Sequence, residues 1–548
     1  MSRCTMIMVG CQRDKVRDGC FWFLGAVVAT LLFCALHLTL GQHHAFGPSW
    51  LESDQGWYLT QLSELVEGKL IYQDIATPYG PLAFYWHLLW VSFFGISPAV
   101  FLVASGFVVA LANGVIAFGL RQHMERVSVS AIIILSAVCI QQYNTGVMLI
   151  TVPWAMLELG IVICLWNRGT EASFRRNILI GLVLGLGQLN KFGYFAVLSG
   201  SIACADVLAC SWTQPRQTAL GLLKRWMTIG VGFICVETVW LAYLFGRLDY
   251  AFALDAAWPS YQVEAYRRAF GKEEELWGAF KYLSLPYFVG RIVPILLMLI
   301  LGIIGYVVGR RHSAHPRAFQ FALGGLAYIV AMVLFFHDIH ALVLHLWMLF
   351  GFLIYAFIVG PKVLRTFAVL VAAAMTAVFP VRWYRAALER PEAVQVTENI
   401  RLWMPEIMAQ KYSELVTILD EHIPASDLIF VYDWEGIPYV TGRKSVGRHS
   451  WPLRGWVREH ELERLHRDLD SLSYFVLEKR PGYSEGLLDE SLGSDSERVE
   501  SEVPFPDEYA QFFATKAGRP QQIGEKWIVV PLVVKDEARP GPMENGPL

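Results

Sequence analysis

A series of long apolar runs in the first 383 residues constrains this chain more than any other feature. A helix that crosses a bilayer needs about 20 predominantly apolar residues, and residues 21–40 form the first such run. Further runs lie at 98–120, 127–143, 146–166, 177–190, 192–210, 222–246, 291–309, 317–336, 341–360 and 363–383. The mean hydropathy is +0.41 and the hydrophobic content is 55%, above the soluble average of about 45–50%. The sequence therefore predicts an α-helical polytopic membrane protein with about 11 transmembrane helices.

After Trp383 the sequence takes on the character of a soluble domain. Segments rich in β-branched and aromatic residues lie at 428–434, 473–478 and 526–534, and helical patterns lie at 397–422, 457–472 and 507–516. Strands that alternate with helices indicate an α/β arrangement. We therefore expect a small soluble α/β domain at 384–535, followed by a disordered tail at 536–548.

Lysine and arginine residues indicate how the chain is oriented in the membrane. They gather in alternate loops, for example at Arg121, Arg168 and Arg310, and such basic loops face the cytoplasm. These loops all fall on the side of residues 1–20 if residues 82–94 do not cross. That apolar run has 13 residues, which is too short to span a bilayer. We therefore expect a helix at 82–94 that lies along the outer surface.

This topology divides the chain into a cytoplasmic tail at 1–20, a membrane domain at 21–383 with external loops at 42–97 and 247–290, and an external C-terminal domain. All nine cysteines precede residue 236, so the C-terminal domain has no disulfides, as is usual for external domains in bacteria. We expect an integral protein of the bacterial inner or plasma membrane whose C-terminal domain is external or periplasmic. The net charge of −3 argues against nucleic acid as a partner.

The stretch at 52–94 follows the first apolar run directly and holds the first acidic residues beyond it. Ser53 or Asp54 is suited to cap a short helix that Gly68 ends. The loop IYQDIATPYGP leads into the expected surface helix, and Pro81 suits the first turn of that helix. We therefore expect two helices at the membrane surface, joined by a loop that carries Asp74 and Tyr79.

A spaced set of residues in this stretch matches the pattern of a known family. Its members are Asp54, Gly56, Tyr58, Gly68, Tyr72, Asp74, Tyr79, Gly80, Pro81, Leu82, Tyr85 and Gly95. The pattern resembles the first external loop of GT-C glycosyltransferases, in particular the bacterial relatives of protein O-mannosyltransferases and aminoarabinose transferases. The resemblance implies transfer of a sugar from a polyprenyl-phosphate carrier to a hydroxyl acceptor, which is a lipid, a glycan or a protein, on the external face.

Asp54 is the leading catalytic candidate. The resemblance implies an essential acid at this position, either as the base or in an acceptor and metal site, and a carboxylate can take a proton from an acceptor hydroxyl. The alternative is a helix cap without chemistry, and Glu52 is interpreted as a solvated charge. The sequence specifies no cofactor. A divalent metal stays open as an alternative, although the second external loop, QQYNTGVML, has no carboxylate and Glu158 lies well inside the next span.

Lys191 interrupts a glycine-rich apolar segment at the outer end of a span. A lysine at a membrane boundary faces a polar cavity or snorkels to the interface. The resemblance implies a ligand of the carrier phosphate, because many GT-C relatives carry a lysine after a glycine-rich helix here. Asp74 and Tyr79 are candidates for substrate contacts. Their alternatives are a hydrogen bond to the loop backbone for Asp74 and anchoring at the interface for Tyr79.

Two further groups of residues complete the candidate substrate site. The turn HDIHA places His337, Asp338 and His340 at the outer end between two spans. There they are suited to bind a divalent ion, to orient a phosphate or to bind the acceptor, with a polar turn as the alternative. Arg267 and Arg268 lie in the long outer loop. They are suited to neutralise the phosphate of the carrier as it leaves, with a solvated charge run as the alternative.

A transporter or flippase of a lipid-linked sugar is the rival interpretation. That class predicts inverted repeats and ionisable residues at mid-membrane, whereas no repeat is evident here and the candidate charges lie at one face. For a transferase we expect an inverting displacement, with Asp54 opposite the leaving phosphate and Lys191 holding that phosphate.

Overall fold

The computed structural model describes residues 2–51, 53–77, 79–120, 147–167, 173–208 and 215–257, together with shorter stretches between 366 and 532. The chain divides into two compact units. The first consists of Met1–Gly47 and Thr77–Pro391, and the second of Pro48–Ala76 and Glu392–Leu548. The predicted spans at 127–143 and from 291 to 360 lie outside the described residues.

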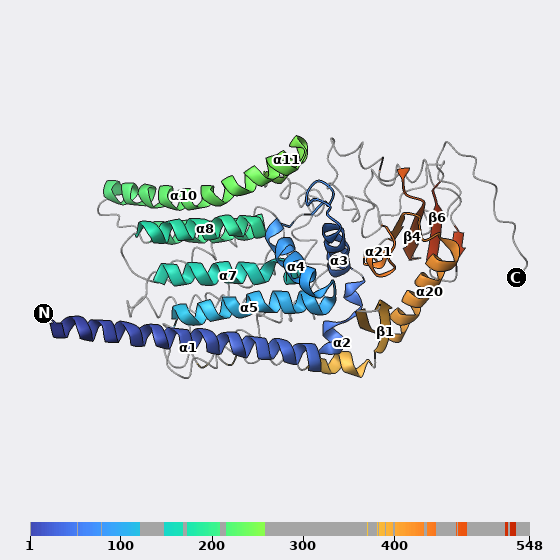
Figure 1. Cartoon of the computed structure of the whole chain (residues 1–548), viewed down its shortest axis with the longest axis horizontal. Coiled ribbons are helices and arrows are strands. Elements are labelled where there is room, and N and C mark those ends of the chain that lie inside the picture. The colour runs from blue at the N-terminus through green and yellow to red at the C-terminus, as the bar shows by residue number, and fades with distance from the viewer. Residues whose placement is uncertain are drawn as a thin grey trace, which may run out of the picture. The chain divides into compact units, whose positions relative to one another are not determined.

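The first unit is a bundle of helices. The long helices α1 (Ser2–Leu40), α5 (Pro98–Leu120), α7 (Val147–Asn167), α8 (Phe174–Asn190) and α10 (Pro215–Arg247) lie side by side in that order (Figure 1). Shorter helices are α2 (Gln42–Ala45), α4 (Pro81–Phe94), α9 (Phe192–Leu208) and α11 (Tyr250–Ala257). Among the described residues, three segments are long and apolar enough to cross a membrane: Gly19–Leu40, Pro98–Phe118 and Ala219–Arg247. The bundle is that of a polytopic membrane protein, and the count of about 11 spans stays a prediction.

Glycines allow α8 and α10 to pack backbone against backbone. A Cβ atom on Gly181 would overlap the carbonyl oxygen of Ile229, and one on Gly232 would overlap the carbonyl oxygen of Ile178. Such close approach of small residues is a usual way for membrane helices to associate. It fixes α8, the helix that ends beside Lys191, against the longest apolar helix of the bundle after α1.

The short apolar run before α5 forms the predicted helix. In α4, Pro81 occupies the first turn, and the helix ends at Gly95, whose φ is +76°. Proline is favoured at a helix start and glycine at such a left-handed end. The helix is therefore confirmed, and its orientation along the outer surface stays a prediction.

The second unit contains two small sheets. The strands β1 (Glu392–Thr397) and β2 (Ile400–Met404) form an antiparallel pair. The other sheet has the order β3 (Ile429–Val431), β4 (Tyr474–Glu478), β6 (Trp527–Pro531) and β5 (Gln521–Ile523), with only β3 and β4 parallel. The helices are η1 (Pro48–Trp50), α3 (Ser53–Val66), α20 (Glu406–His422) and α21 (Ile437–Val440). Each of the three predicted strand segments contains a strand, while the extent of an α/β domain at 384–535 stays a prediction.

The long helix of the second unit, α20, is amphipathic. Its buried residues are Ala409, Tyr412, Leu415, Ile418 and Leu419. They recur three or four positions apart, which places them on one face of the helix. This periodicity is why the helix could be recognised in the sequence.

The predicted helix at 397–422 is wrong at its start. The first part of that range contains β2, in which Ile400, Leu402 and Met404 are buried and the residues between them are more exposed. Alternation with period two is the pattern of a strand. Pro405 follows, and the residue before a proline avoids the helical conformation. The helix therefore begins only after Pro405.

Candidate functional site

In the first unit, the break between α8 and α9 meets the segment that leads into α4. Lys191 lies at this break, with an extended backbone (φ −161°, ψ 126°). The N–H of Gly80 donates to the carbonyl oxygen of Asn190 (2.8 Å). A Cβ atom on Gly80 would overlap the carbonyl oxygen of Leu189, so no side chain fits there. The motif segment around Gly80 is therefore docked on the backbone that leads to Lys191.

The side chain of Lys191 lies against the motif tyrosine. Its Nζ atom is 5.4 Å from the centroid of the Tyr79 ring, which is within the range of a cation–π interaction. Both residues are buried, with 9% of Lys191 and 1% of Tyr79 exposed. The structure thus brings together two predicted site residues that are far apart in the sequence.

Glu158 of α7 is a buried acid near the same break. It is 4% exposed, and a Cβ atom on Gly187 of α8 would lie only 3.0 Å from its Oε2 atom. The carbonyl oxygen of Gly187 accepts the N–H of Lys191 (3.0 Å), so the carboxyl group packs on the helical turn that ends at Lys191. Glu158 is not among the site residues predicted from the sequence. The signal that could have found it is an acid inside an apolar span, which marks a functional candidate.

Tyr85, another residue of the motif, connects α4 to α10. Its hydroxyl oxygen lies 2.5 Å from that of Tyr243, and the Tyr243 ring stacks on Trp240 with centroids 5.4 Å apart. Burial and the hydrogen bond to Tyr243 raise the pKa of the Tyr85 hydroxyl. Tyr85 therefore holds α4 to the bundle.

In the second unit, Asp54 lies in the first turn of α3. Its side chain and Glu52 lie outside the described part of the chain. The backbone around Asp54 is closely packed, because the N–H of Gly436 donates to the carbonyl oxygen of Leu51 (2.9 Å). A Cβ atom on Gly56 would lie 2.6 Å from that same oxygen. The glycine of the Asp-x-Gly motif therefore belongs to a backbone contact with the C-terminal part of the chain.

Asp74 stabilises its own loop. Its Oδ2 atom accepts the N–H of Leu70 (2.9 Å), and its own N–H donates to the carbonyl oxygen of Leu70 (2.8 Å). The side chain of Gln61 in α3 holds the end of the loop by donating to the carbonyl oxygen of Ala76 (2.7 Å). This is the structural role that the sequence offered for Asp74, and a substrate contact stays a prediction.

The remaining candidates, Arg267, Arg268, His337, Asp338 and His340, lie outside the described residues. Within the part of the chain that the structure describes, no three Asp, Glu, His or Cys residues are placed to hold one metal ion. The roles of these five residues and the metal alternative therefore stay predictions.

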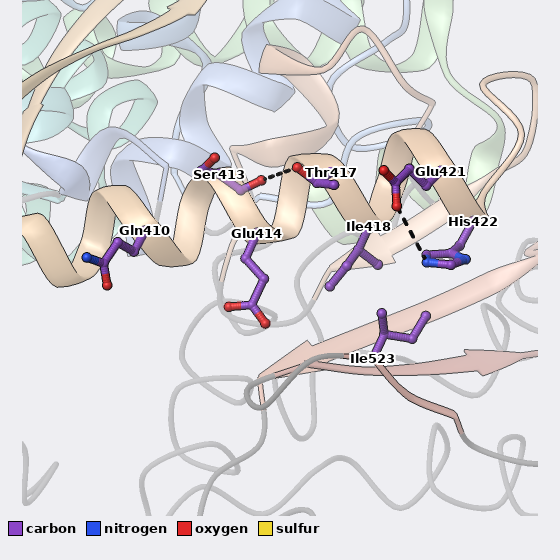
Figure 2. Close-up of a pocket in the computed structure, with 8 residues that line it drawn as sticks. All are labelled: Gln410, Ser413, Glu414, Thr417, Ile418, Glu421, His422 and Ile523. Carbon is purple, nitrogen blue, oxygen red and sulfur yellow. Dashed lines mark hydrogen bonds and ion pairs between the residues drawn. The ribbon is translucent and has the colours of Figure 1, made fainter. Parts of the chain in front are cut away.

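A hollow of about 460 Å³ opens between α20 and β5 in the second unit (Figure 2). The residues that line it are Gln410, Ser413, Glu414, Thr417, Ile418, Glu421, His422 and Ile523. The hydroxyl of Thr417 donates to the carbonyl oxygen of Ser413 (2.9 Å), and Nε2 of His422 lies 4.0 Å from Oε2 of Glu421. This lining includes no residue that the sequence predicted for the site.

No family model matches the chain, and no curated protein matches it. Solved structures do match. ArnT from Cupriavidus metallidurans bound to undecaprenyl phosphate is similar over 92% of this chain and 98% of its own, with 12% identity and a TM-score of 0.47. The archaeal oligosaccharyltransferase AglB from Archaeoglobus fulgidus, in complex with an inhibitory peptide and a dolichol-phosphate, is similar over 84% of this chain and 69% of its own, with 14% identity and a TM-score of 0.45. ArnT in the apo state covers 92% of this chain and 98% of its own, with 13% identity and a TM-score of 0.35.

Identities of 12–14% assign no role to any residue of this chain. The function proposed below therefore rests on the residues of the chain itself.

Proposed function

We propose that this chain is a membrane glycosyltransferase that moves one sugar from a polyprenyl-phosphate carrier to a hydroxyl acceptor on the external face of a bacterial inner or plasma membrane. The observation that carries the proposal is the contact of Tyr79 and Gly80 with the α8–α9 break at Lys191. The pattern that resembles the family and the lysine expected to bind the carrier were identified separately in the sequence, and they meet in the first unit.

Lys191 binds the phosphate of the carrier in this proposal. Its ammonium group is buried and lies 5.4 Å from the centroid of the Tyr79 ring. A phosphate oxygen is a strong acceptor for such a buried cation, because charge-assisted hydrogen bonds are stronger than neutral ones. Arg267 and Arg268 then stabilise the negative charge that develops as the phosphate leaves.

Asp54 is the base of the transfer step. It takes the proton of the acceptor hydroxyl while the acceptor oxygen bonds to the anomeric carbon of the sugar. The bond from that carbon to the phosphate oxygen breaks, and its electron pair leaves with the polyprenyl phosphate. Attack from the face opposite the phosphate inverts the configuration of the sugar. A divalent metal held with the help of Asp54 is the alternative role of this acid.

Four other polar residues contact the substrates in this proposal. His337, Asp338 and His340 orient the phosphate or bind the acceptor at the outer end of two spans. Asp74 supports the first external loop and reaches the substrate from it. The sequence offers each of these assignments beside a structural alternative, and each can be tested by substitution once an assay exists.

A transfer assay with a defined donor tests the proposal. The chain is overproduced in bacterial membranes, which contain hydroxyl acceptors, and a polyprenyl-phosphate sugar labelled in the sugar is added. Undecaprenyl and dolichyl carriers are the first choices, because the matched structures hold these lipid phosphates. We expect the label to appear on a hydroxyl acceptor, with unsugared polyprenyl phosphate released. A transporter or flippase would instead move the intact labelled lipid between leaflets, and that result without any transfer would contradict the proposal.

A further inference from the structure

The segment GIPYVTGR of the second unit, residues 436–443, packs on the start of α3. The N–H of Gly436 donates to the carbonyl oxygen of Leu51 (2.9 Å), and α21 contacts α3. The approach is between backbones, because a Cβ atom on Gly436 would lie 2.7 Å from the carbonyl oxygen of Trp50 and 3.1 Å from the Cα atom of Gly56. A side chain on Gly436 would therefore push the start of α3 away.

Both ends of this segment are anchored in the core of the second unit. Just before it, Trp434 is 1% exposed and packs edge-on against Trp527 of β6, with ring centroids 5.7 Å apart. At the other end, the buried guanidinium group of Arg443 donates to the carbonyl oxygens of Leu419 (2.6 Å) and Ile423 (3.0 Å). The segment is thus a fixed platform against which α3 rests.

The position of Asp54 follows from this contact. Asp54 lies between Leu51 and Gly56, the two places where the start of α3 meets the platform. Because an α-helix rises about 1.5 Å per residue, Asp54 is only about 3 Å along the helix axis from Gly56. Displacement of a catalytic group by about 1 Å can cost about 10²-fold in rate. The Asp-x-Gly spacing therefore has a physical reason, since the glycine provides the contact that locates the acid.

We infer that Gly436 is a positioning residue, which fixes the start of α3 and with it the Asp54 base. The inference rests on the proposed function for the role of Asp54. It gives the C-terminal part of the chain a role in sugar transfer, because residues 436–443 and the α3 start that carries Asp54 belong to the same second unit.

Gly436→Ala tests this inference, with Gly442→Ala as the matched control in the same segment. Gly436 has a φ of −80°, which alanine adopts without strain, so the added methyl group acts only through its contact with the start of α3. Gly442 has a φ of +66° and open space around its Cβ position, so alanine strains its backbone without touching α3.

In the full-length protein, Gly436→Ala should speed amide hydrogen exchange in the first turns of α3 and lower kcat by about 10²-fold. The KM for the donor should stay unchanged, because the carrier phosphate is bound by Lys191 of the first unit. Gly442→Ala should lower the unfolding temperature. It should leave the amide exchange of α3 and the kcat as in the wild type. If Gly436→Ala does not accumulate as folded protein, Gly56→Ala probes the same contact, because a Cβ atom there would lie 2.8 Å from the amide nitrogen of Gly436.

Wild-type exchange in α3 together with wild-type kcat in Gly436→Ala would overturn the inference. Faster exchange with unchanged kcat would also overturn it, as would an equal loss of kcat in Gly442→Ala. Failure of the proposed function gives a different result, because the wild-type protein would then transfer no sugar, and a fully active Asp54→Asn protein would refute only the role of Asp54 as the base. The exchange measurement reports on the contact in either case.

Discussion

At the scale of single residues, two glycines of the motif are explained by backbone contacts. Gly80 docks on the carbonyl groups before Lys191, and Gly56 docks on Leu51 and Gly436. Neither glycine has a positive φ, so steric exclusion of a side chain accounts for them, and left-handed geometry does not. A sequence pattern shows that a glycine is present, but it does not show which of these two reasons applies.

Gly80→Ala should destabilise the first unit. The added methyl group would overlap the carbonyl oxygen of Leu189, and overpacking of this kind costs about 1–3 kcal/mol. Gly230→Ala on α10 is the control, because nothing lies within 4 Å of its Cβ position. Thermal unfolding in detergent should show a lower transition for Gly80→Ala than for the control. Equal transitions would mean that the docked segment adapts freely.

Lys191→Ala should weaken use of the lipid donor. One lost charge-assisted contact costs about 1.5–3 kcal/mol, which corresponds to an increase of roughly 10- to 150-fold in the donor KM if binding limits it. Lys224→Ala removes an exposed lysine of α10 and serves as the control. Unchanged donor kinetics in well-expressed Lys191→Ala would rule out the phosphate-binding role.

At the scale of elements, the sequence predicted what local periodicity encodes. The apolar runs that became α5, α7 and α9 begin within one residue of their predicted starts. The helix at 397–422 was misplaced at its start because a short strand pair before Pro405 was merged with the following amphipathic helix. Residues 48–76 also group with the C-terminal unit, and no local pattern encodes a contact between segments so distant in the sequence.

The candidate site was predictable to a similar degree. Asp54 is a candidate because it belongs to the pattern that resembles the family, and Lys191 is a candidate because it interrupts an apolar segment, and both roles stay predictions. Glu158 could have been found as an acid inside an apolar span, whereas the contact of Gly436 with Leu51 depends on a neighbour far away in the sequence. The sequence allowed either a substrate contact or a hydrogen bond to the loop backbone for Asp74. Only the structure shows that its carboxylate accepts the N–H of Leu70.

Arg443→Met should destabilise the second unit. Methionine is chosen because its side chain is nearly as long as that of arginine but has no hydrogen-bond donor. The substitution leaves the carbonyl oxygens of Leu419, Ile423 and Pro424 without their guanidinium donor. Loss of hydrogen bonds to a charged group costs about 1.5–3 kcal/mol. Amide exchange at the end of α20 should become faster in Arg443→Met. The neighbouring exposed Lys444 supplies the control, and a Lys444→Met protein that changes as much would contradict this account.

At the scale of the whole molecule, the chain combines an apolar helical bundle with a polar unit that contains two sheets. The bundle holds polar residues on interior faces, for example Gln188 of α8, whose Nε2 atom donates to Glu237 of α10 (3.2 Å). Polar groups inside a membrane bundle are costly unless they are paired or serve a function.

The topology prediction follows from the basic loops and the short helix α4. We expect residue 121 to face the cytoplasm and residue 435 to lie outside. In a background without the native cysteines, Arg121→Cys should be protected from an impermeant thiol reagent in intact cells, and Glu435→Cys should be labelled. Labelling of Arg121→Cys or protection of Glu435→Cys would overturn the topology.

The central claim is that Asp54 performs chemistry, and the most direct test is the rate of sugar transfer by Asp54→Asn, with Glu52→Gln as its neighbour control. Asparagine caps a helix as well as aspartate does, so the substitution separates capping from proton transfer. The account predicts that Asp54→Asn folds with an unchanged unfolding temperature and loses about 10²- to 10⁴-fold in transfer rate, while Glu52→Gln stays active. A folded Asp54→Asn protein that transfers sugar from the polyprenyl-phosphate donor at the wild-type rate would contradict it.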